Sequence, residues 1–551
     1  NRDGIIETFF QLGVVDNGLT VKQKEANHEV YLDNRLIGRF SLETEQIAET
    51  GDYYYFITYK PIVTLEQPLV LRASILSSSR EASYRHIDYP NHVQKLKEGL
   101  ITADTPPDLQ DGVLEEPRQL DKRMELPEHS LYVDGKDFSL HLNRVNLYEP
   151  LGNGVRRAKD QLSPPFSYRQ QEVKNNRKAS TGINRPAISP DGKPASYVEH
   201  VWEITLPQLA DHEIEHWGLI GQASMFRWED EEQKNLYTVA NLDRVRKWTQ
   251  GGVQYITPIT YHPYDPNGFW LVPAQHVGNR LLLSGKDRFS LNMAILSLEA
   301  ALATQRDEGM WLTQPRSEWL YEDYGIEAGF YDTRFSTDAA LFLIYGYREF
   351  GHPRYLKGAI RYADFLVKFA STHHFETENG GYLVWDYRDG HWDEATRKET
   401  HVSLNHLITE MNFLLELIKE LKGIDPDVLS RLMKNEEGKN NKAVENVDVM
   451  ENVEVAIKVR INTYLDVAEK IRIAVQDTKV HWKKEENGDL WYAYMPDGSF
   501  GLLDYPLLTL KDLRYSQELF EEIYGERDPA FQYLIEVKEE YLRGQGLPLY
   551  D

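Results

Sequence analysis

The sequence predicts a mixed β and α protein, with an antiparallel β-sandwich or barrel in the N-terminal half followed by an (α/α) toroid-like helical domain. Up to Gly285 the chain consists mainly of short segments with alternating apolar residues, which is typical of strands. After Gly285 the apolar residues recur with helical spacing, and long aromatic loops separate the helices. A chain of 551 residues also exceeds one ordinary hydrophobic core, so several domains are expected.

We expect three regions. Residues 1–130 form a β-rich region, because HEVYLDNRLIGRFSL and DYYYFITYKPIVTL alternate apolar and polar residues beside turn residues. Residues 131–285 form an antiparallel β-sandwich or barrel domain, with strand-like segments from SLYVDGKDFSL through NLYTVANL to NRLLLSG at meander spacing. Residues 286–551 form the toroid-like helical domain, in which the charged stretch 434–454 is an exposed insertion.

The helices of the third region have recognisable ends. FSLNMAILSLEAALATQ contains neither proline nor glycine, and in STDAALFLIYGYREF either Ser336 or Thr337 is the predicted N-cap. Pro353 is placed just inside the next helix, where its missing N–H is tolerated. Helices paired by short loops are the layout of an α/α hairpin array, whose loops converge at one end.

Composition excludes several classes of function. With 87 acidic and 62 basic residues the net charge is −25, which argues against nucleic-acid binding. The absence of cysteine excludes disulfides, cysteine nucleophiles and thiolate metal sites, and is compatible with a location outside the cytoplasm. No apolar run is long enough to span a membrane. The chain begins at Asn1, which is what trimming of an N-terminal signal or anchor would leave.

Four loops should meet at one end of the helices, namely 311–337, 372–380, 384–400 and 488–506. They combine carboxylates, arginines, tyrosines and tryptophans, which together supply proton transfer, carboxylate binding and stacking surfaces for sugars. No metal or other cofactor is predicted: the adjacent pair His373 and His374 lacks the spacing of metal ligands on a helix, and no nucleophile-elbow, phosphate-loop or dinucleotide motif occurs. Carboxylates such as Glu327, Asp332 and Glu394 leave a glycosidase open.

From about Phe289 onward the chain resembles the C-terminal domain of the D-glucuronyl C5-epimerases. The resemblance is carried by QRDEGMWLTQPRSEWLYEDYGIEAGFYDTRFSTDAA, HPRYLKGAIRYADFL, DGHWDEATRKETHVSLNHL and LDYPLLTLKDLRYSQELFEEIYGERDPAFQYLIEVKEEYL, in the family's order. It implies a β-rich portion before an α/α domain, a uronic-acid polysaccharide as substrate, and a homodimer. The family's catalytic tyrosine falls on Tyr505, a second tyrosine on Tyr492 or Tyr494, and its glutamate on Glu394.

Inversion at C5 requires a base, an acid on the opposite face of the ring, and a cation for the charge that develops on the carboxylate. We therefore expect Glu394 and Tyr505 as catalytic residues, with Tyr492 or Tyr494 orienting the substrate. A tyrosine acts as the base only if its neighbours lower its pKa. The predicted substrate-binding residues, which supply the cation and the aromatic contacts, are Arg334, Arg316, Tyr331, Tyr324 and Trp392.

The predicted function is that of a C5-epimerase-like enzyme acting outside the cytoplasm on a uronic-acid glycan. A polysaccharide lyase shares the proton abstraction, and a glycoside hydrolase shares the carboxylates, so both stay open. A non-catalytic glycan-binding protein is the third alternative. It is favoured by the absence of the arginine that follows the hairpin tyrosine in the family, and by Ala395 and Thr396 at positions near Glu394 where the family has a tyrosine.

Overall fold

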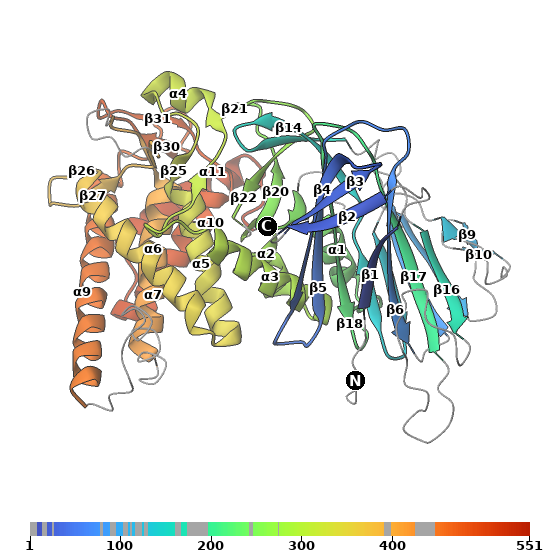
Figure 1. The fold of residues 1–551 in the computed structure, drawn as a ribbon. Coiled ribbons are helices and arrows are strands. Elements are labelled where there is room, and N and C mark those ends of the chain that lie inside the picture. The colour runs from blue at the N-terminus through green and yellow to red at the C-terminus, as the bar shows by residue number, and fades with distance from the viewer. Residues whose placement is uncertain are drawn as a thin grey trace. The chain divides into compact units, whose positions relative to one another are not determined.

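The chain divides into two compact units, each described by itself (Figure 1). The first comprises residues 1–259, 263–272 and 277–296, and the second comprises residues 260–262, 273–276 and 297–551. The computed structural model describes residues 8–13, 19–24, 27–77, 81–88, 95–102, 108–110, 113–115, 124–125, 130–159, 167–173, 197–241, 246–273, 275–390, 398–424 and 447–550.

Besides the two-stranded sheet of β9 (Asp108–Gln110) and β10 (Val113–Glu115), the described part of the first unit contains two antiparallel sheets. The smaller has five strands in the order β1 (Thr8–Gly13), β6 (Leu69–Ser77), β17 (Tyr197–Leu206), β16 (Ser167–Val173) and β11 (Met124–Glu125). The larger has fourteen strands and runs β19 (Arg246–Thr249), β20 (Gly252–Ile256), β22 (Gly268–Val272), β15 (Val155–Ala158), β14 (Asn146–Gly152), β18 (Glu213–Gly221), β13 (Ser139–Leu142), β12 (Leu131–Gly135), β7 (Glu81–Asp88) and β8 (Lys95–Thr102). Strand β18 also pairs along its other edge with β5 (Tyr53–Pro61), which continues to β4 (Arg35–Gln46), β3 (Asn27–Leu32) and β2 (Leu19–Lys24).

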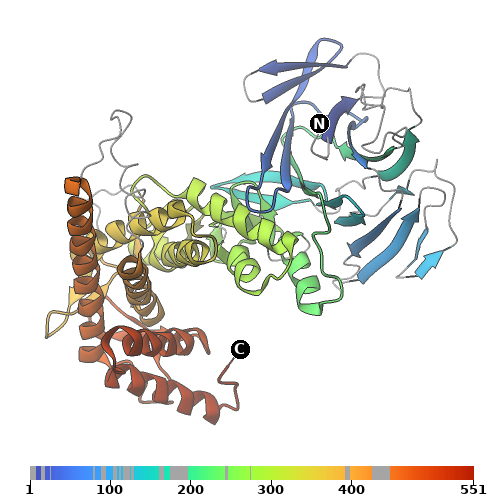
Figure 2. The same ribbon diagram turned by 90° about the horizontal axis from the view of Figure 1, so that it is seen from below.

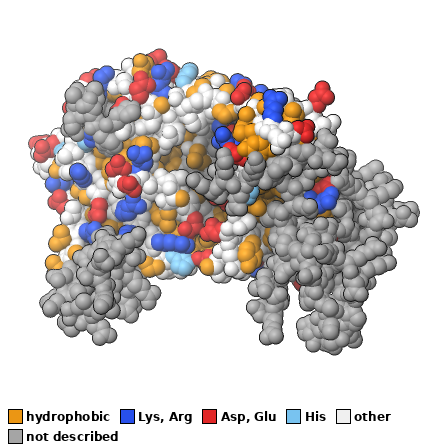
Figure 3. Space-filling model, viewed as in Figure 1, with side chains coloured by type: hydrophobic (Ala, Val, Ile, Leu, Met, Phe, Trp, Pro, Cys, Tyr) orange, Lys and Arg blue, Asp and Glu red, His pale blue; other side chains and the backbone are white. Residues whose placement is uncertain are grey.

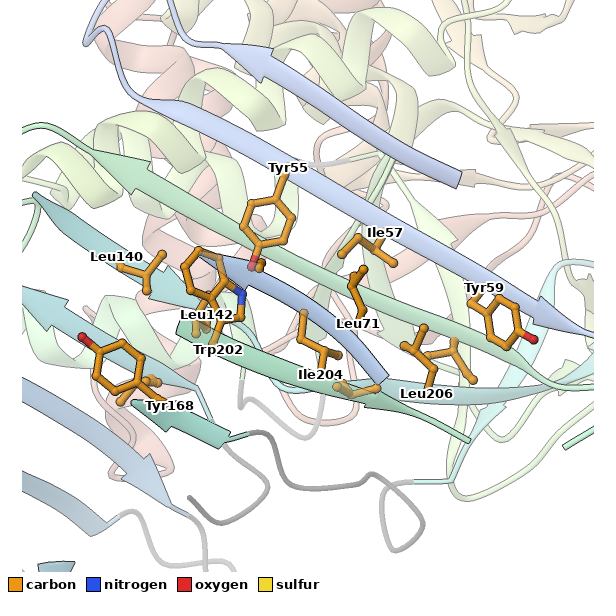
Figure 4. Close-up of a cluster of buried hydrophobic side chains, with 14 of the residues drawn as sticks. Tyr55, Ile57, Tyr59, Leu71, Leu140, Leu142, Tyr168, Trp202, Ile204 and Leu206 are labelled. Carbon is orange, nitrogen blue, oxygen red and sulfur yellow. The ribbon is translucent and has the colours of Figure 1, made fainter. Parts of the chain in front are cut away.

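One hydrophobic core draws on both sheets (Figure 4). Trp202 and Ile204 of β17 and Tyr55 and Ile57 of β5 are buried members of it, at the alternate positions expected for one face of a strand. The hydroxyl of Tyr55 has a hydrogen-bond partner, because it lies 2.9 Å from Nε2 of the buried His216 on β18. Strands from the predicted regions 1–130 and 131–285 pair with each other in both sheets, as β6 does with β17 and β7 with β12.

Two segments that we expected to be strands are helices. NLYTVANL lies in α1 (Glu231–Asn241) and NRLLLSG in α2 (Gln275–Ser284). Helix α1 begins at an acidic cap, since the carboxylate of Asp230 accepts the backbone N–H of Glu232 at 3.0 Å. A short apolar run does not by itself distinguish a strand from a helix, and the cap was the decisive signal.

The second unit is an array of packed helices (Figures 1 and 2). Helix α5 (Thr333–Phe350) packs on α6 (Pro353–Thr372) and α7 (Leu404–Gly423); α7 packs on α9 (Val447–Thr478) and α10 (Leu508–Tyr524); and α10 packs on α11 (Pro529–Gly544). Helix α3 (Arg288–Thr304) contributes its last residues to this unit. Gly346 lets α5 approach α3 closely, because a Cβ there would lie 2.4 Å from Cδ2 of Leu298.

Of the two helix starts that we predicted from capping residues, the start of α6 is confirmed and the start of α5 is corrected. Pro353 occupies the first turn of α6 as expected. Helix α5 begins four or five residues earlier than predicted, with Asp332 as its N-cap in place of Ser336 or Thr337, both of which are buried inside the helix. Of the predicted insertion 434–454, residues 434–446 lie outside the described residues, and 447–454 form the first turns of α9.

The described surface is of mixed charge. On the face drawn in Figure 3, Lys and Arg side chains lie among Asp and Glu side chains, not in one basic field. Within the described ranges, none of the helices combines the length and the apolar character needed to cross a membrane.

Candidate active site

The four predicted loops lie next to one another in the helical unit, joined by short strands. Strand β25 (Phe330–Asp332) pairs with β23 (Leu312–Thr313) and β28 (Tyr387–Arg388), whereas β30 (Trp491–Tyr494) pairs with β29 (Val402–Ser403) and β31 (Phe500–Leu503). The Asp386 N–H connects the two small sheets by donating to the His401 carbonyl at 3.1 Å. The hairpin of β26 (His374–Glu376) and β27 (Tyr382–Val384) reaches β30 where the rings of Phe375 and Tyr494 lie 5.4 Å apart. The starts of α5 and α7 are therefore surrounded by polar loop residues.

Asp332 is the central carboxyl group of this region. It caps α5 by accepting the Phe335 N–H at 3.0 Å, and its side chain is only 4% exposed. Capping and the helix dipole both favour the ionised form. Burial outweighs them and raises the pKa of Asp332 to about 7. A carboxyl group with this pKa is half protonated near neutral pH, as a group that gives and takes protons should be.

Asp386 and His401 form a second buried pair. Oδ1 of Asp386 accepts the Ser403 N–H at 2.8 Å, the Ser403 hydroxyl donates to Oδ2, and Nε2 of His401 lies 3.4 Å from Oδ2. On the other side of the ring, Nδ1 of His401 lies 2.9 Å from the Tyr324 hydroxyl. Burial raises the pKa of Asp386 well above its ordinary value and lowers the pKa of His401 to about 4. At neutral pH His401 is therefore uncharged; it lies between Tyr324 and Asp386, and its Nε2 makes no hydrogen bond to a described residue.

Glu410 and His406 lie deeper on α7 and enlarge the cluster. Both oxygens of Glu410 are fully buried without a well-formed hydrogen bond to any described residue. Burial, and then the charge of Asp386, raise the pKa of Glu410 well above its ordinary value. Nδ1 of His406 lies 3.5 Å from Oδ2 of Asp386 and 3.0 Å from the Thr333 hydroxyl, and burial lowers its pKa. Because like charges this close oppose ionisation together, protonated and ionised carboxyl groups coexist here.

Three tyrosines form the margin of the cluster. Tyr505 is 51% exposed, and its ring meets the edge of Tyr492 at 5.7 Å. Burial raises the pKa of Tyr505, Tyr492 and Tyr261, and the charge of Asp332 raises all three further. A catalytic tyrosine base requires the opposite shift, so Tyr505 does not have the lowered pKa that a base would need. A role of Tyr505 as a proton donor, and the expected role of Tyr492 in orienting the substrate, stay predictions.

The two predicted substrate-binding arginines are engaged by carboxylates. Arg334 lies 2.6 Å from Asp512 and 3.2 Å from Asp338, and its side chain is 17% exposed. Arg316 lies 2.5 Å from Glu318. Neither guanidinium presents an uncompensated charge to a substrate carboxylate.

The remaining predicted residues separate into three groups. Tyr331 is fully buried, with its ring 5.0 Å from that of Phe369, so it belongs to the helical core and not to a substrate surface. Tyr494 lies on β30 beside Phe375, away from the contacts that join Tyr492 to Tyr505. Glu394 and Trp392 lie outside the described residues.

Sequence reasoning missed His401, His406 and Glu410. A signal for two of them was present, because His406 and Glu410 are four residues apart in the otherwise apolar helix segment LNHLITEMNFLL and so share a face. Polar groups on a buried helix face need partners or a function. Among the described residues, no group of three or more His, Asp and Glu side chains is arranged to hold a metal ion. Carboxyl and imidazole groups are of the kinds that exchange protons in acid–base catalysis.

Similarity to solved structures is low. The chain is similar to a D-mannose isomerase with 14% identity over 49% of this chain and 58% of that one, at a TM-score of 0.29. It is similar to a mannosidase of glycoside hydrolase family 76 from Bacteroides thetaiotaomicron with 14% identity over 51% and 64%, at a TM-score of 0.31. A cellobiose 2-epimerase from Bacillus thermoamylovorans matches with 12% identity over 48% and 72%, at a TM-score of 0.24.

The chain thus spans 58% and 64% of the lengths of the first two proteins. No protein-family model matches the chain. No curated protein matches it either. Similarity at this level carries no conclusion about activity, and the function has to follow from the side chains of the site.

Proposed function

We propose that this chain is a carbohydrate-modifying enzyme in which Asp332 transfers a proton. The observation that carries the proposal is a buried carboxyl group with a pKa near 7, next to two further buried carboxyl groups and two uncharged histidines. The half-exposed ring of Tyr505 beside Tyr492 supports a sugar as substrate, because aromatic faces cover the apolar faces of pyranoses. We also propose that the helical unit is an (α/α) toroid, because helices joined by short loops, such as α5 with α6 and α10 with α11, form antiparallel pairs.

The first candidate reaction is epimerisation or isomerisation by proton transfer at a carbon next to a carbonyl group. Ionised Asp332 would remove the proton, and a protonated neighbour, Asp386 or Glu410, would stabilise the charge that develops on oxygen. Return of a proton to the opposite face completes an inversion. Inversion of uronic acid residues at C5, as the sequence resemblance implies, is one form of this reaction, with Glu394 as the second catalytic residue.

The second candidate is cleavage of a glycosidic bond. It is favoured by the mutual influence of Asp332 and Asp386, because the negative charge of Asp332 raises the pKa of Asp386 in addition to the effect of burial. Hydrolases use two carboxyl groups in different protonation states on either side of the bond. A lyase would follow the same proton abstraction with loss of the substituent at C4. Action outside the cytoplasm on a polysaccharide, as a homodimer, completes the proposal.

One experiment distinguishes these reactions. The protein is incubated in deuterated water with uronic-acid polysaccharides and with uncharged oligosaccharides, and the products are followed by NMR, mass spectrometry and ultraviolet absorbance. Deuterium on carbon without chain shortening supports epimerisation or isomerisation, unsaturated ends support a lyase, and new reducing ends without them support a hydrolase. Binding without any of these products contradicts the enzymatic proposal and supports a glycan-binding protein.

Substitutions connect the activity to the site. Asp332→Asn preserves an N-cap residue but cannot exchange a proton, so it should lower the rate by about 100-fold to 10,000-fold, the usual contribution of general acid–base catalysis. Asp528→Asn, at the N-cap of α11, is the matched control and should leave the rate near that of the wild type. Glu394→Gln tests the residue that the sequence resemblance implies. Full activity of Asp332→Asn would show that the proton is transferred elsewhere.

A further inference from the structure

The loops around the candidate site carry a strong excess of negative charge. Among the described residues, 311–337 contain five acidic and two basic side chains, 384–390 with 398–400 contain three and two, and 488–506 contain three and none. Two of these acidic residues, Asp489 and Asp504, are paired with the buried ammonium of Lys538, which leaves nine acidic side chains against four basic ones. A substrate that carries a carboxylate would enter a region of negative potential, which lowers its local concentration and its affinity.

The two predicted substrate-binding arginines do not offset this potential. Arg334 is held between Asp338 at 3.2 Å and Asp512 at 2.6 Å, so this partly buried triad is negative overall when both carboxylates are ionised. Arg316 lies 2.5 Å from Glu318 and 3.9 Å from Glu327. To bind a uronate, Arg334 would have to give up a carboxylate that already satisfies it, and Arg316 would have to exchange Glu318 for the uronate.

The surfaces that remain are aromatic. Tyr505 is half-exposed, and its ring contacts Tyr492, which is in turn 6.2 Å from the ring of His401. Trp319 also contacts the His401 ring, at 5.3 Å. Rings with hydroxyl or N–H groups at their edges suit the hydroxyls and C–H faces of an uncharged sugar.

We infer that the site takes an uncharged sugar, or one bearing an amine, and not a uronic acid. This inference rests on the proposed function and narrows it. An uncharged sugar has an acidic C–H only beside its carbonyl group, which exists at the reducing end in the open-chain form. Proton transfer would then occur at C2 of a reducing-end residue, with the electron pair of the C–H bond passing to the aldehyde oxygen and a carboxyl group supplying the proton there. The alternative for such a substrate is hydrolysis.

The test compares matched ligands on an inactive protein. Oligosaccharides of a uronic acid and the same oligosaccharides after reduction of every carboxylate to a hydroxymethyl group are titrated into the Asp332→Asn variant by calorimetry. We expect the reduced ligands to bind at least about tenfold more tightly, and the affinity for the uronates to rise as salt screens their repulsion. Tighter binding of the uronates, or binding that weakens with added salt, would overturn the inference. Absence of binding by both ligands would overturn the inference and the carbohydrate substrate together.

A second variant tests the electrostatic reason. Asp338→Asn removes one of the two carboxylates that hold Arg334 and should raise the affinity for the uronates several-fold. Asp364→Asn, which removes the carboxylate that faces Arg460 at 3.3 Å between α6 and α9, is the control and should not change it. An equal change in both variants would contradict the role of Arg334. Because all of these measurements are of binding, tight binding of the uncharged ligands without turnover by the wild type would leave the substrate inference standing and refute the proposed catalysis.

Discussion

Replacing Asp332 with asparagine should stabilise the protein at alkaline pH while it removes activity. The pKa of Asp332 is about 7 in the folded chain, against 3.8 for an unperturbed aspartate. A carboxyl group whose pKa is raised by folding favours the folded state when protonated. Its contribution is complete below pH 3.8 and is lost as the pH rises through 7.

The magnitude follows from the linkage relation. Between pH 5 and pH 8.5 an aspartate with these two pKa values should lower the free energy of unfolding by about 3 kcal/mol, a loss that asparagine does not undergo. The gain in stability of Asp332→Asn over the wild type should therefore be about 3 kcal/mol larger at pH 8.5 than at pH 5. Urea unfolding followed by circular dichroism at the helix band measures this difference.

Asp528→Asn is the matched control, because Asp528 is also a buried N-cap. Although burial alone would raise its pKa, hydrogen bonds from Arg472 and Gln476 hold the pKa of Asp528 below its ordinary value. A depressed pKa contributes stability above pH 3.8 that is lost only as the pH falls further, so this variant should be less stable than the wild type by a similar amount at both pH values. If Asp332→Asn behaves in the same way, Asp332 is an ordinary ionised cap, and the central observation of the site is refuted.

Three further substitutions test the helical unit by the same unfolding assay. Gly346→Ala should destabilise it by about 1–3 kcal/mol because the new methyl group meets a leucine of α3, whereas Gly423→Ala, which meets no described atom within 4 Å, should not destabilise it. Lys538→Met should cost about 3–5 kcal/mol, because the fully buried ammonium contacts two aspartates at 2.7 and 2.8 Å that would be left unpaired; a loss below 1 kcal/mol would contradict this. Leu502→Gly should stabilise by about 1 kcal/mol, since Leu502 has a φ of 67°, whereas Leu503→Gly relieves no positive φ and should not stabilise.

Much of the fold was predictable because it depends on local patterns. The change from strand to helix spacing near Gly285 and the first-turn position of Pro353 follow from residue periodicity and backbone chemistry, and both appear in the structure. The helices α1 and α2 were not predicted, because a short apolar run does not by itself distinguish a strand from a helix. The pairing of strands from 1–130 with strands from 131–285 depends on contacts distant in sequence, which a local pattern does not encode.

The candidate site was predictable at the level of loops and less so at the level of residues. The loops at 311–337, 384–400 and 488–506 do lie together, since their strands pair directly or through one backbone hydrogen bond. Which carboxyl group has a shifted pKa depends on burial and on the partner that each arginine selects, and neither can be read from one sequence. His401 in particular precedes α7 in a polar stretch, where its complete burial leaves no local signal.

Asp332 and Asp528 show why the candidate site lies at the start of α5 and not at the start of α11. Both residues cap a helix, both are buried, and both have an arginine nearby. Arg472 donates directly to Asp528 at 2.7 Å, and the pKa of that carboxyl group falls. Arg334, two residues after Asp332, instead contacts Asp338 and Asp512, and the pKa of Asp332 rises to about 7. The same local motif thus gives two opposite pKa shifts: burial prevails at Asp332, the group that we propose transfers a proton, whereas hydrogen bonds from Arg472 and Gln476 prevail at Asp528.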